Sequence, residues 1–237
     1  MNKIIKVFCF ALLIISSSFL LSACGKKTET TTSTPVKKTT KSIQIELADN
    51  EKPYVSLIPS TDGHTLTFKV NNIPSKFSTA EYELIYTAQD EKIEIEKGVS
   101  GTVKLEGSTT ISKDLLLGTA SCTNGCKYKY DEGVTGGTLT LTLTTDDNQY
   151  FSYETPFVLE NGTDINKNKK LTLNQENFTV NGTVTTKSEY FIAIKNSTAI
   201  YSIFSSSTGK GKITSIEPTT VTKTDLTSIT GDYTISQ

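Results

Sequence analysis

The chain has 237 residues, and its 24 basic residues, all Lys, nearly balance 25 Asp and Glu for a formal net charge of −1. Without Arg or a basic cluster, it lacks the surface that nucleic acids require and the guanidinium groups that bind phosphate or carboxylate in a bidentate manner. We therefore expect no nucleic-acid partner, and a length sufficient for one large or two small domains.

The first 23 residues have the parts of a secretory signal peptide. Lys3 and Lys6 supply a positive start, and residues 8–21 are apolar apart from three consecutive serines. This stretch is shorter than the roughly 20 apolar residues that a permanent membrane-spanning helix needs. The sequence therefore predicts a cleavable signal peptide over residues 1–23 and export from the cytoplasm.

The end of this segment, Leu21-Ser22-Ala23-Cys24, resembles the lipobox of bacterial lipoprotein precursors. The resemblance implies cleavage after Ala23 and lipid, with acyl chains such as palmitate, on Cys24. Two or three chains anchor a protein firmly, because each buried methylene contributes about 0.8 kcal/mol. We therefore expect a membrane partner through Cys24, on the cell membrane or an outer membrane, facing outside the cytoplasm. The alternatives are an ordinary signal peptide with an incidental Cys24 and a plain transmembrane anchor.

The segment after the lipobox is rich in Thr and Lys. Residues 25–41 contain little apolar surface besides Val36. Such a segment cannot bury enough surface to offset the entropy lost on ordering it. Together with the lipidated Cys24, it is predicted to form a flexible, disordered stalk over residues 24–41.

From residue 42 onward, apolar and polar residues alternate, which is typical of strands with one buried face. Turn signals such as Asp62-Gly63 and Gly136-Gly137 separate the runs. No stretch has a helical period, and a helical turn is conceivable only over residues 112–117. The sequence therefore predicts an all-β protein. The alternating residues include Ile43, Ile45 and Leu47, then Leu66, Phe68 and Val70, then Tyr82, Leu84 and Tyr86, then Leu139, Leu141 and Leu143.

The strands at residues 54–57, 66–70 and 82–86 resemble the opening strands of immunoglobulin-like and fibronectin type III-like modules. The resemblance implies an immunoglobulin-like β-sandwich over residues 42–160. The chain departs from antibody domains because it has no Trp and because its cysteines are too close to bridge two sheets. Residues 114–143 are also similar to uncharacterised envelope proteins of small-genome bacteria, a likeness that implies no activity.

The four cysteines divide into two groups. Cys9 falls in the predicted signal peptide and the lipobox resemblance assigns the lipid to Cys24, which leaves Cys122 and Cys126 on either side of an Asn-Gly turn signal. Outside the cytoplasm, such a close pair is predicted to form a disulfide that pins a local hairpin. The alternatives are free thiols and a metal or redox site. Zinc would need four ligands, and redox pairs favour two intervening residues.

Residues 161–170 are polar and are predicted to form a boundary, followed by more strand-like runs. We expect a second, smaller β domain over residues 161–237, with a single extended sandwich as the alternative. The run that begins at Asp164 resembles half of a calcium loop. Lys169 replaces its required Gly, and neighbouring Lys residues would repel the ion. A linker is therefore favoured over a calcium site.

No serine elbow, zinc-binding helix or phosphate loop occurs in the sequence. His64 is the only histidine, and its place after a turn predicts a solvated turn residue. The sequence therefore predicts no enzyme and no catalytic, cofactor-binding or metal-binding residue. A pair of carboxylates can serve a hydrolase without any signature, which keeps that class as a less favoured alternative.

Aromatic residues flank the cysteine pair and the strands beside it. If exposed, they would form a binding patch, and if directed inward they would belong to the core. Together with the anchor and stalk, they favour a surface binding or interaction module for a protein or glycan partner. The alternative is a structural envelope protein without a dedicated ligand. The aromatic residues are Tyr128, Tyr130, Tyr150, Phe151 and Tyr153.

Overall fold

The computed structural model describes residues 42–236 except Lys92 and Asn124. The predicted signal peptide, the predicted lipidation site Cys24 and the predicted stalk therefore lie outside the described residues. Among the residues described, no helix is long and apolar enough to cross a membrane. The prediction of an all-β protein is confirmed, since antiparallel sheets make up most of the chain.

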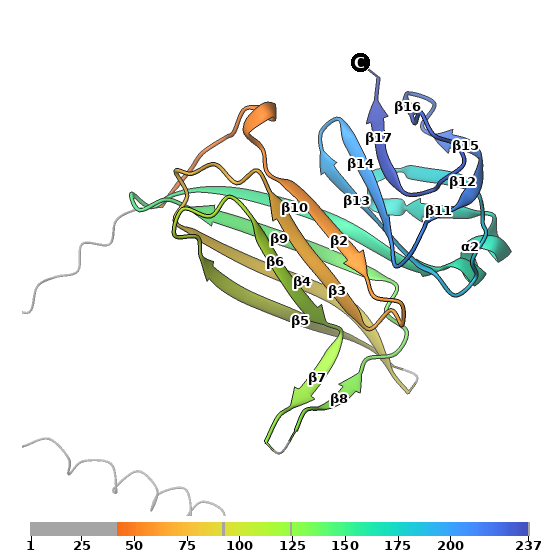
Figure 1. Cartoon of the computed structure of the whole chain (residues 1–237), viewed down its shortest axis with the longest axis horizontal. Helices are drawn as coiled ribbons and strands as arrows, with labels where there is room; N and C mark the ends of the chain where they lie inside the picture. Colours follow the sequence, from red (N-terminus) through yellow and green to blue (C-terminus); the bar gives the residue numbers. More distant parts are fainter. Residues whose placement is uncertain (1–41, 92, 124, 237) are drawn as a thin grey trace, which may run out of the picture. The chain divides into compact units, whose positions relative to one another are not determined.

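The largest element is a nine-stranded sheet whose strands run in the order β16-β17-β14-β13-β10-β9-β4-β5 (Figure 1). The ninth strand, β1, pairs in parallel with the start of β10, and the other pairs are antiparallel. The strands are β1 (Ile43–Gln44), β4 (Thr79–Asp90), β5 (Ile93–Lys104), β9 (Gly136–Thr144), β10 (Gln149–Asn161), β13 (Tyr190–Ser197), β14 (Ile200–Ser205), β16 (Val221–Thr222) and β17 (Gly231–Ile235).

Two three-stranded sheets and one separate hairpin complete the fold. The first sheet has the order β2-β3-β6, the second has the order β11-β12-β15, and β7 pairs only with β8. Their strands are β2 (Tyr54–Pro59), β3 (Thr65–Asn71), β6 (Ile111–Leu116), β7 (Gly118–Ser121), β8 (Lys127–Tyr130), β11 (Lys170–Leu173), β12 (Phe178–Val184) and β15 (Gly211–Glu217). The helical segments are α2 (Gly162–Asn168), η1 (Asp49–Glu51) and η2 (Asn174–Glu176).

The two small sheets cover opposite faces of the large one. Phe157 and Leu159 of β10 lie in a hydrophobic cluster with residues of β2, β3 and β6, whereas Val158 packs against a second cluster containing residues of β11 and β12. Successive side chains of a strand point to opposite faces. On β13, Ile192 belongs to the first cluster and Phe191 to the second in the same way. Strands β10 and β13 are therefore buried on both faces.

A polar clamp joins β2 to the far part of the large sheet. The Asn196 side chain accepts a hydrogen bond from the Val55 amide at 3.1 Å and donates one to the Val55 carbonyl at 2.6 Å. The Tyr54 hydroxyl donates to Asp232 at 2.8 Å. Burial, together with the nearby Asp232, raises the pKa of Tyr54 to about 12. These contacts satisfy the polar groups involved and fix β2 across β13 and β17.

The predicted boundary after residue 160 falls inside β10, whose last residue is Asn161. Strand β10 crosses the boundary and pairs with β13, which lies wholly after it, in one ladder of hydrogen bonds. A separate small domain over residues 161–237 stays a prediction, as does the immunoglobulin-like subtype of the sandwich before it. In the structure, residues 42–160 and 161–237 share the nine-stranded sheet. The first region contributes most of the first hydrophobic core and the second region most of the second core.

The expectation that no helix would form is wrong at the predicted polar boundary. Residues 162–168 form α2, and the Asn161 side chain caps it by accepting a hydrogen bond from the Asp164 amide at 3.0 Å. One residue, Ile165, anchors the helix in the second core. The suggestion of a helical turn at residues 112–117 is also wrong, because β6 occupies most of that stretch.

Candidate functional site

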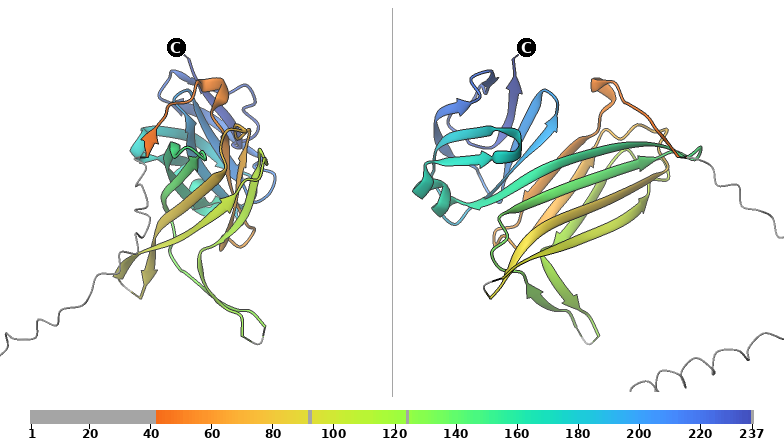
Figure 2. Two further views of the ribbon diagram at one scale, coloured as in Figure 1. Left: turned by 90° about the vertical axis from the view of Figure 1, so that its left-hand side faces the viewer. Right: turned by 180° about the vertical axis from the view of Figure 1, so that it is seen from behind.

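The hairpin of β7 and β8, termed the arm, projects from the body of the protein in each of the views (Figures 1 and 2). At its tip, the sulfur atoms of Cys122 and Cys126 lie at disulfide-bonding distance, which agrees with the predicted disulfide. Gly125 lies between them at a φ of 87°, a value that side-chain-bearing residues rarely adopt. The tip is therefore closed by a covalent link across a tight turn.

The base of the arm is held by a buried carboxylate. Asp131 follows β8 directly, is 8 % exposed, and accepts hydrogen bonds from the Tyr86 hydroxyl at 2.8 Å and from Lys97. Burial and the bond to Asp131 raise the pKa of Tyr86. Tyr86 lies on β4 and Lys97 on β5, and the next residue, Glu132, accepts a backbone hydrogen bond from Gln89 of β4. The arm is thereby fixed to the large sheet at its base.

Aromatic rings form a row along the arm. Tyr128 is 55 % exposed and Tyr130 39 % exposed, and their rings are parallel with centroids 6.2 Å apart. The Tyr130 ring also stacks on His64, with the ring centroids 4.3 Å apart. Lys127 and Lys129 alternate with the tyrosines and are also exposed. Exposed tyrosines on a rigid support are characteristic of protein-binding surfaces.

The structure separates the aromatic residues that the sequence grouped together. Tyr128 and Tyr130 lie on the arm, whereas Phe151 is buried in the first core and Tyr153 packs against that core. The Tyr153 hydroxyl donates a hydrogen bond to the Lys195 carbonyl at 2.7 Å. The interpretation of His64 as a solvated turn residue missed its stacking on Tyr130, because that contact joins residues far apart in the sequence.

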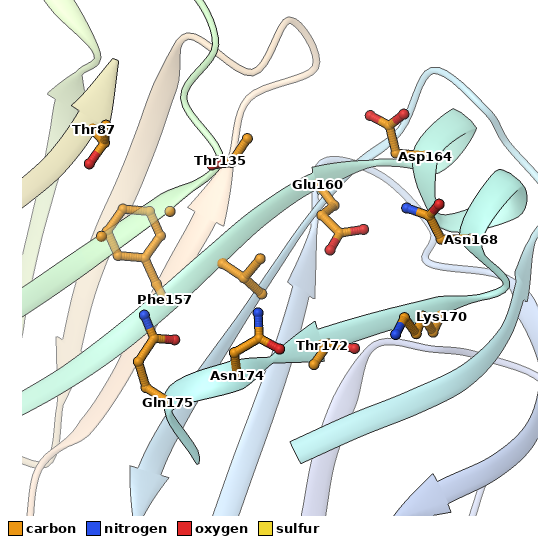
Figure 3. A pocket seen from close by; sticks show the side chains of 13 residues that line it. Thr87, Thr135, Phe157, Glu160, Asp164, Asn168, Lys170, Thr172, Asn174 and Gln175 are labelled. Atoms are coloured by element: carbon orange, nitrogen blue, oxygen red, sulfur yellow. The ribbon is translucent and has the colours of Figure 1, made fainter. Parts of the chain in front are cut away.

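A groove of about 600 Å³ lies where the large sheet meets β11 and α2 (Figure 3). Strand β11 is an edge strand of its sheet, so its outer side borders the groove. The floor includes Gly136 and Gly137, which contribute only backbone, and the rest of the lining is mostly polar. The polar side chains include Thr135, Glu160, Asp164, Asn168, Lys170, Asn174 and Gln175.

Glu160 is the most perturbed group in the groove. Its side chain points from β10 toward β11 (Figure 3), and its Oε2 atom is buried without a hydrogen-bond partner among the described residues. Burial and then the nearby Asp164 raise the pKa of Glu160 to about 7, and Lys170 opposes this shift. The carboxyl group therefore changes its charge close to neutral pH.

A smaller hollow of about 260 Å³ shares lining residues with this groove and also borders the base of the arm. Glu160 and Asp164 line it as well, together with His64, Asp131 and Glu132. Within the described part of the chain, no group of three or more His, Cys, Asp or Glu residues is placed to hold a metal ion. Asp164 instead belongs to the cap of α2, where its carboxylate accepts a hydrogen bond from Asn161 at 2.8 Å.

Comparisons with protein-family models, with curated proteins and with solved structures find no match for this chain. The candidate sites are therefore inferred from the residues of this chain alone. The sequence indicated the cysteine pair and the arm tyrosines but neither Glu160 nor the Asp131 anchor. A local signal for Glu160 exists, since it is an acidic residue in an otherwise apolar strand run and directly precedes the Asn161 helix cap.

Proposed function

We propose that the protein is a lipid-anchored, extracytoplasmic binding module that contacts a protein or glycan partner through the β7–β8 arm. Cys24 serves as the anchor and residues 24–41 as the spacer. Residues 42–160 form an immunoglobulin-like sandwich, and residues 161–237 form a smaller β region. The arm carries the proposal, because it extends beyond both hydrophobic cores, has a disulfide across its tip and is tied to the large sheet at its base.

The rigidity of the arm supports binding for an energetic reason. An isolated two-stranded hairpin is marginally stable in water. Here the tip is linked through Cys122 and Cys126, and the base is tied to the body through Asp131. A surface ordered in advance loses less conformational entropy when a partner binds. The exposed Tyr128 and Tyr130 would then supply contact area at low entropic cost.

The two alternative functions have less support. A structural envelope protein would not require a rigid arm with exposed aromatic side chains. One observation favours a hydrolase that uses two carboxylates: the raised pKa of Glu160 suits a general acid. Its second carboxylate would be Asp164, which is already engaged by the cap of α2.

The arm is tested by site-specific photo-crosslinking in intact cells. A benzoyl-phenylalanine at position 128 is expected to form a covalent adduct with the partner. The same residue at position 150, an aromatic site on β10 outside the arm, should form none. Equal adducts at both positions, or none at position 128, would contradict the proposal.

The anchor has a separate test with a matched control. Cys24→Ala should release the protein from the membrane fraction and abolish labelling by a palmitate analogue, because the acylated thiol is lost. Cys9→Ala, within the predicted signal peptide, should change neither result. Unchanged fractionation and labelling of the Cys24 variant would refute lipid anchoring.

A further inference from the structure

The groove beside β11 lacks the features of three common kinds of site. No group of three metal-ligating side chains occurs among the described residues, which disfavours a cation-coordinating site. The aromatic residue in the lining, Phe157, is only 1 % exposed, so no ring is available to stack against a sugar. Anions would face two carboxylates, Glu160 and Asp164, against a single Lys170. The balance of charge favours a cationic ligand.

The hydrogen-bonding groups specify the ligand further. An ionised carboxylate can only accept hydrogen bonds, and the buried Oε2 of Glu160 has no donor among the described residues. A ligand that satisfies it must therefore donate, and a charged donor forms the stronger bond. The amides of Asn168, Asn174 and Gln175 can both donate and accept, so they suit the polar remainder of such a ligand.

We propose that this groove binds a ligand carrying a primary alkylammonium group, which Glu160 receives beside the negative charge of Asp164, while the neighbouring amides hold the rest of the molecule. The groove volume is within the range of small-molecule sites. A free linear amine and a lysine side chain of another protein share this chemistry. The site is separate from the exposed tyrosines of the arm, so its failure would leave the proposed function untouched.

Binding should depend on pH through Glu160. The charged groups that face it in the groove are Asp164 from α2 and Lys170 from β11. The adjoining hollow adds Asp62, His64, Asp131 and Glu132. With a pKa of about 7, Glu160 is mostly protonated at pH 6 and mostly ionised at pH 8. The affinity for an ammonium group should therefore fall about tenfold from pH 8 to pH 6, because the ionised fraction of Glu160 falls about tenfold between these pH values.

The experiment measures binding to the purified full chain by isothermal titration calorimetry. The probes are 1,5-diaminopentane and a blocked Gly-Lys-Gly peptide, with 1,5-pentanediol as the uncharged control. Binding of either amine at pH 8, with no binding of the diol, is expected. A preference for the diamine would identify free amines as the source of the ligand, and a preference for the peptide would identify lysine side chains.

Two variants separate this site from general surface charge. Glu160→Gln keeps the shape of the side chain and should weaken amine binding at least tenfold at pH 8, and it should also remove the pH dependence. Glu154→Gln on the same strand lies outside the groove and should bind like the original protein. Circular dichroism checks that both variants fold. Absence of amine binding at millimolar concentration, or equal binding by both variants, would overturn the proposal.

Discussion

The arm and the groove each contain a buried carboxylate, but within the described part of the chain only the one in the arm has a hydrogen-bond donor on both oxygens. Asp131 at the base of the arm has a donor on each oxygen, from Tyr86 and from Lys97. Glu160 in the groove has one oxygen buried without a donor among the described residues. Removing one partner of a satisfied buried carboxylate is costly, and a buried carboxylate without a donor destabilises the fold unless a proton or a ligand arrives. The buried carboxylate at the base of the arm therefore has its hydrogen bonds satisfied within the fold, whereas the carboxylate in the groove does not among the described residues.

The largest effect on stability is expected from the arm anchor. Asp131→Ala leaves Tyr86 and Lys97 without their shared acceptor, and Lys97 is still about a third exposed. We expect a loss of about 2–3 kcal/mol in the free energy of unfolding, below the 3–5 kcal/mol typical of fully buried pairs. Urea denaturation measures it.

An exposed aspartate gives the control for that variant. Asp114 on β6 accepts a hydrogen bond from Thr67 at the surface. Asp114→Ala should cost less than about 1 kcal/mol, as exposed polar contacts do. Similar losses in the two variants would show that Asp131 is not a special anchor.

The next effect concerns the tip of the arm. Replacing Cys122 and Cys126 by Ser removes a link that closes a very short loop, so we expect at most about 2 kcal/mol of lost stability. Lysine-specific proteolysis at Lys127 and Lys129 should accelerate strongly, because the arm opens locally. Cleavage rates before and after reduction of the unsubstituted protein provide the comparison. If cleavage does not change, the link is not what orders the tip.

Glu160 should show a smaller effect with a defined pH dependence. Its pKa is raised above the ordinary value of 4.5 to about 7, so the folded state holds this proton more tightly than the unfolded state. The stabilising contribution is complete below pH 4.5 and is lost as the pH rises through 7. Glu160→Gln stays neutral and should stabilise the protein by roughly 1 kcal/mol at pH 8, allowing for solvent screening. Denaturation at pH 8 and pH 4 should show a gain only at pH 8.

The smallest effect on stability is expected at the exposed tyrosines. Tyr128→Ser should change the free energy of unfolding by no more than about 0.5 kcal/mol, because surface substitutions rarely do more. Partner capture through the arm should nevertheless be lost. A large loss of stability would mean that Tyr128 supports the fold instead of serving as a contact surface.

Local patterns predicted much of this architecture, and long-range contacts account for what they missed. Alternation at Leu139, Leu141 and Leu143 predicted β9, since one face of that strand is buried. The seven residues of α2 are too few to show a helical period, although the capping residue Asn161 was a usable signal. Continuous apolar runs such as residues 157–159 and 191–194 were the signal for strands buried on both faces.

The candidate sites were predictable to different extents. The cysteine pair and the arm tyrosines are close in sequence, so the tip could be predicted as a hairpin. The stacking of His64 on Tyr130 and the bonds of Asp131 to Tyr86 and Lys97 join distant segments, and no local pattern encodes them. Most of the groove lining comes from residues 157–175, but Thr87 and residues 135–137 reach it from distant parts of the sequence, so no local pattern reveals the groove.

The two-sided burial of β10 determines how the protein should melt. Phe157 and Leu159 serve one core and Val158 the other, so opening either core removes packing from the same strand. The Asn196 clamp adds hydrogen bonds between β2 and the far part of the sheet. Differential scanning calorimetry should therefore record one cooperative transition, with equal calorimetric and van't Hoff enthalpies. A cut after residue 160 would fall inside β10 and would divide the paired strands β10 and β13 between two pieces.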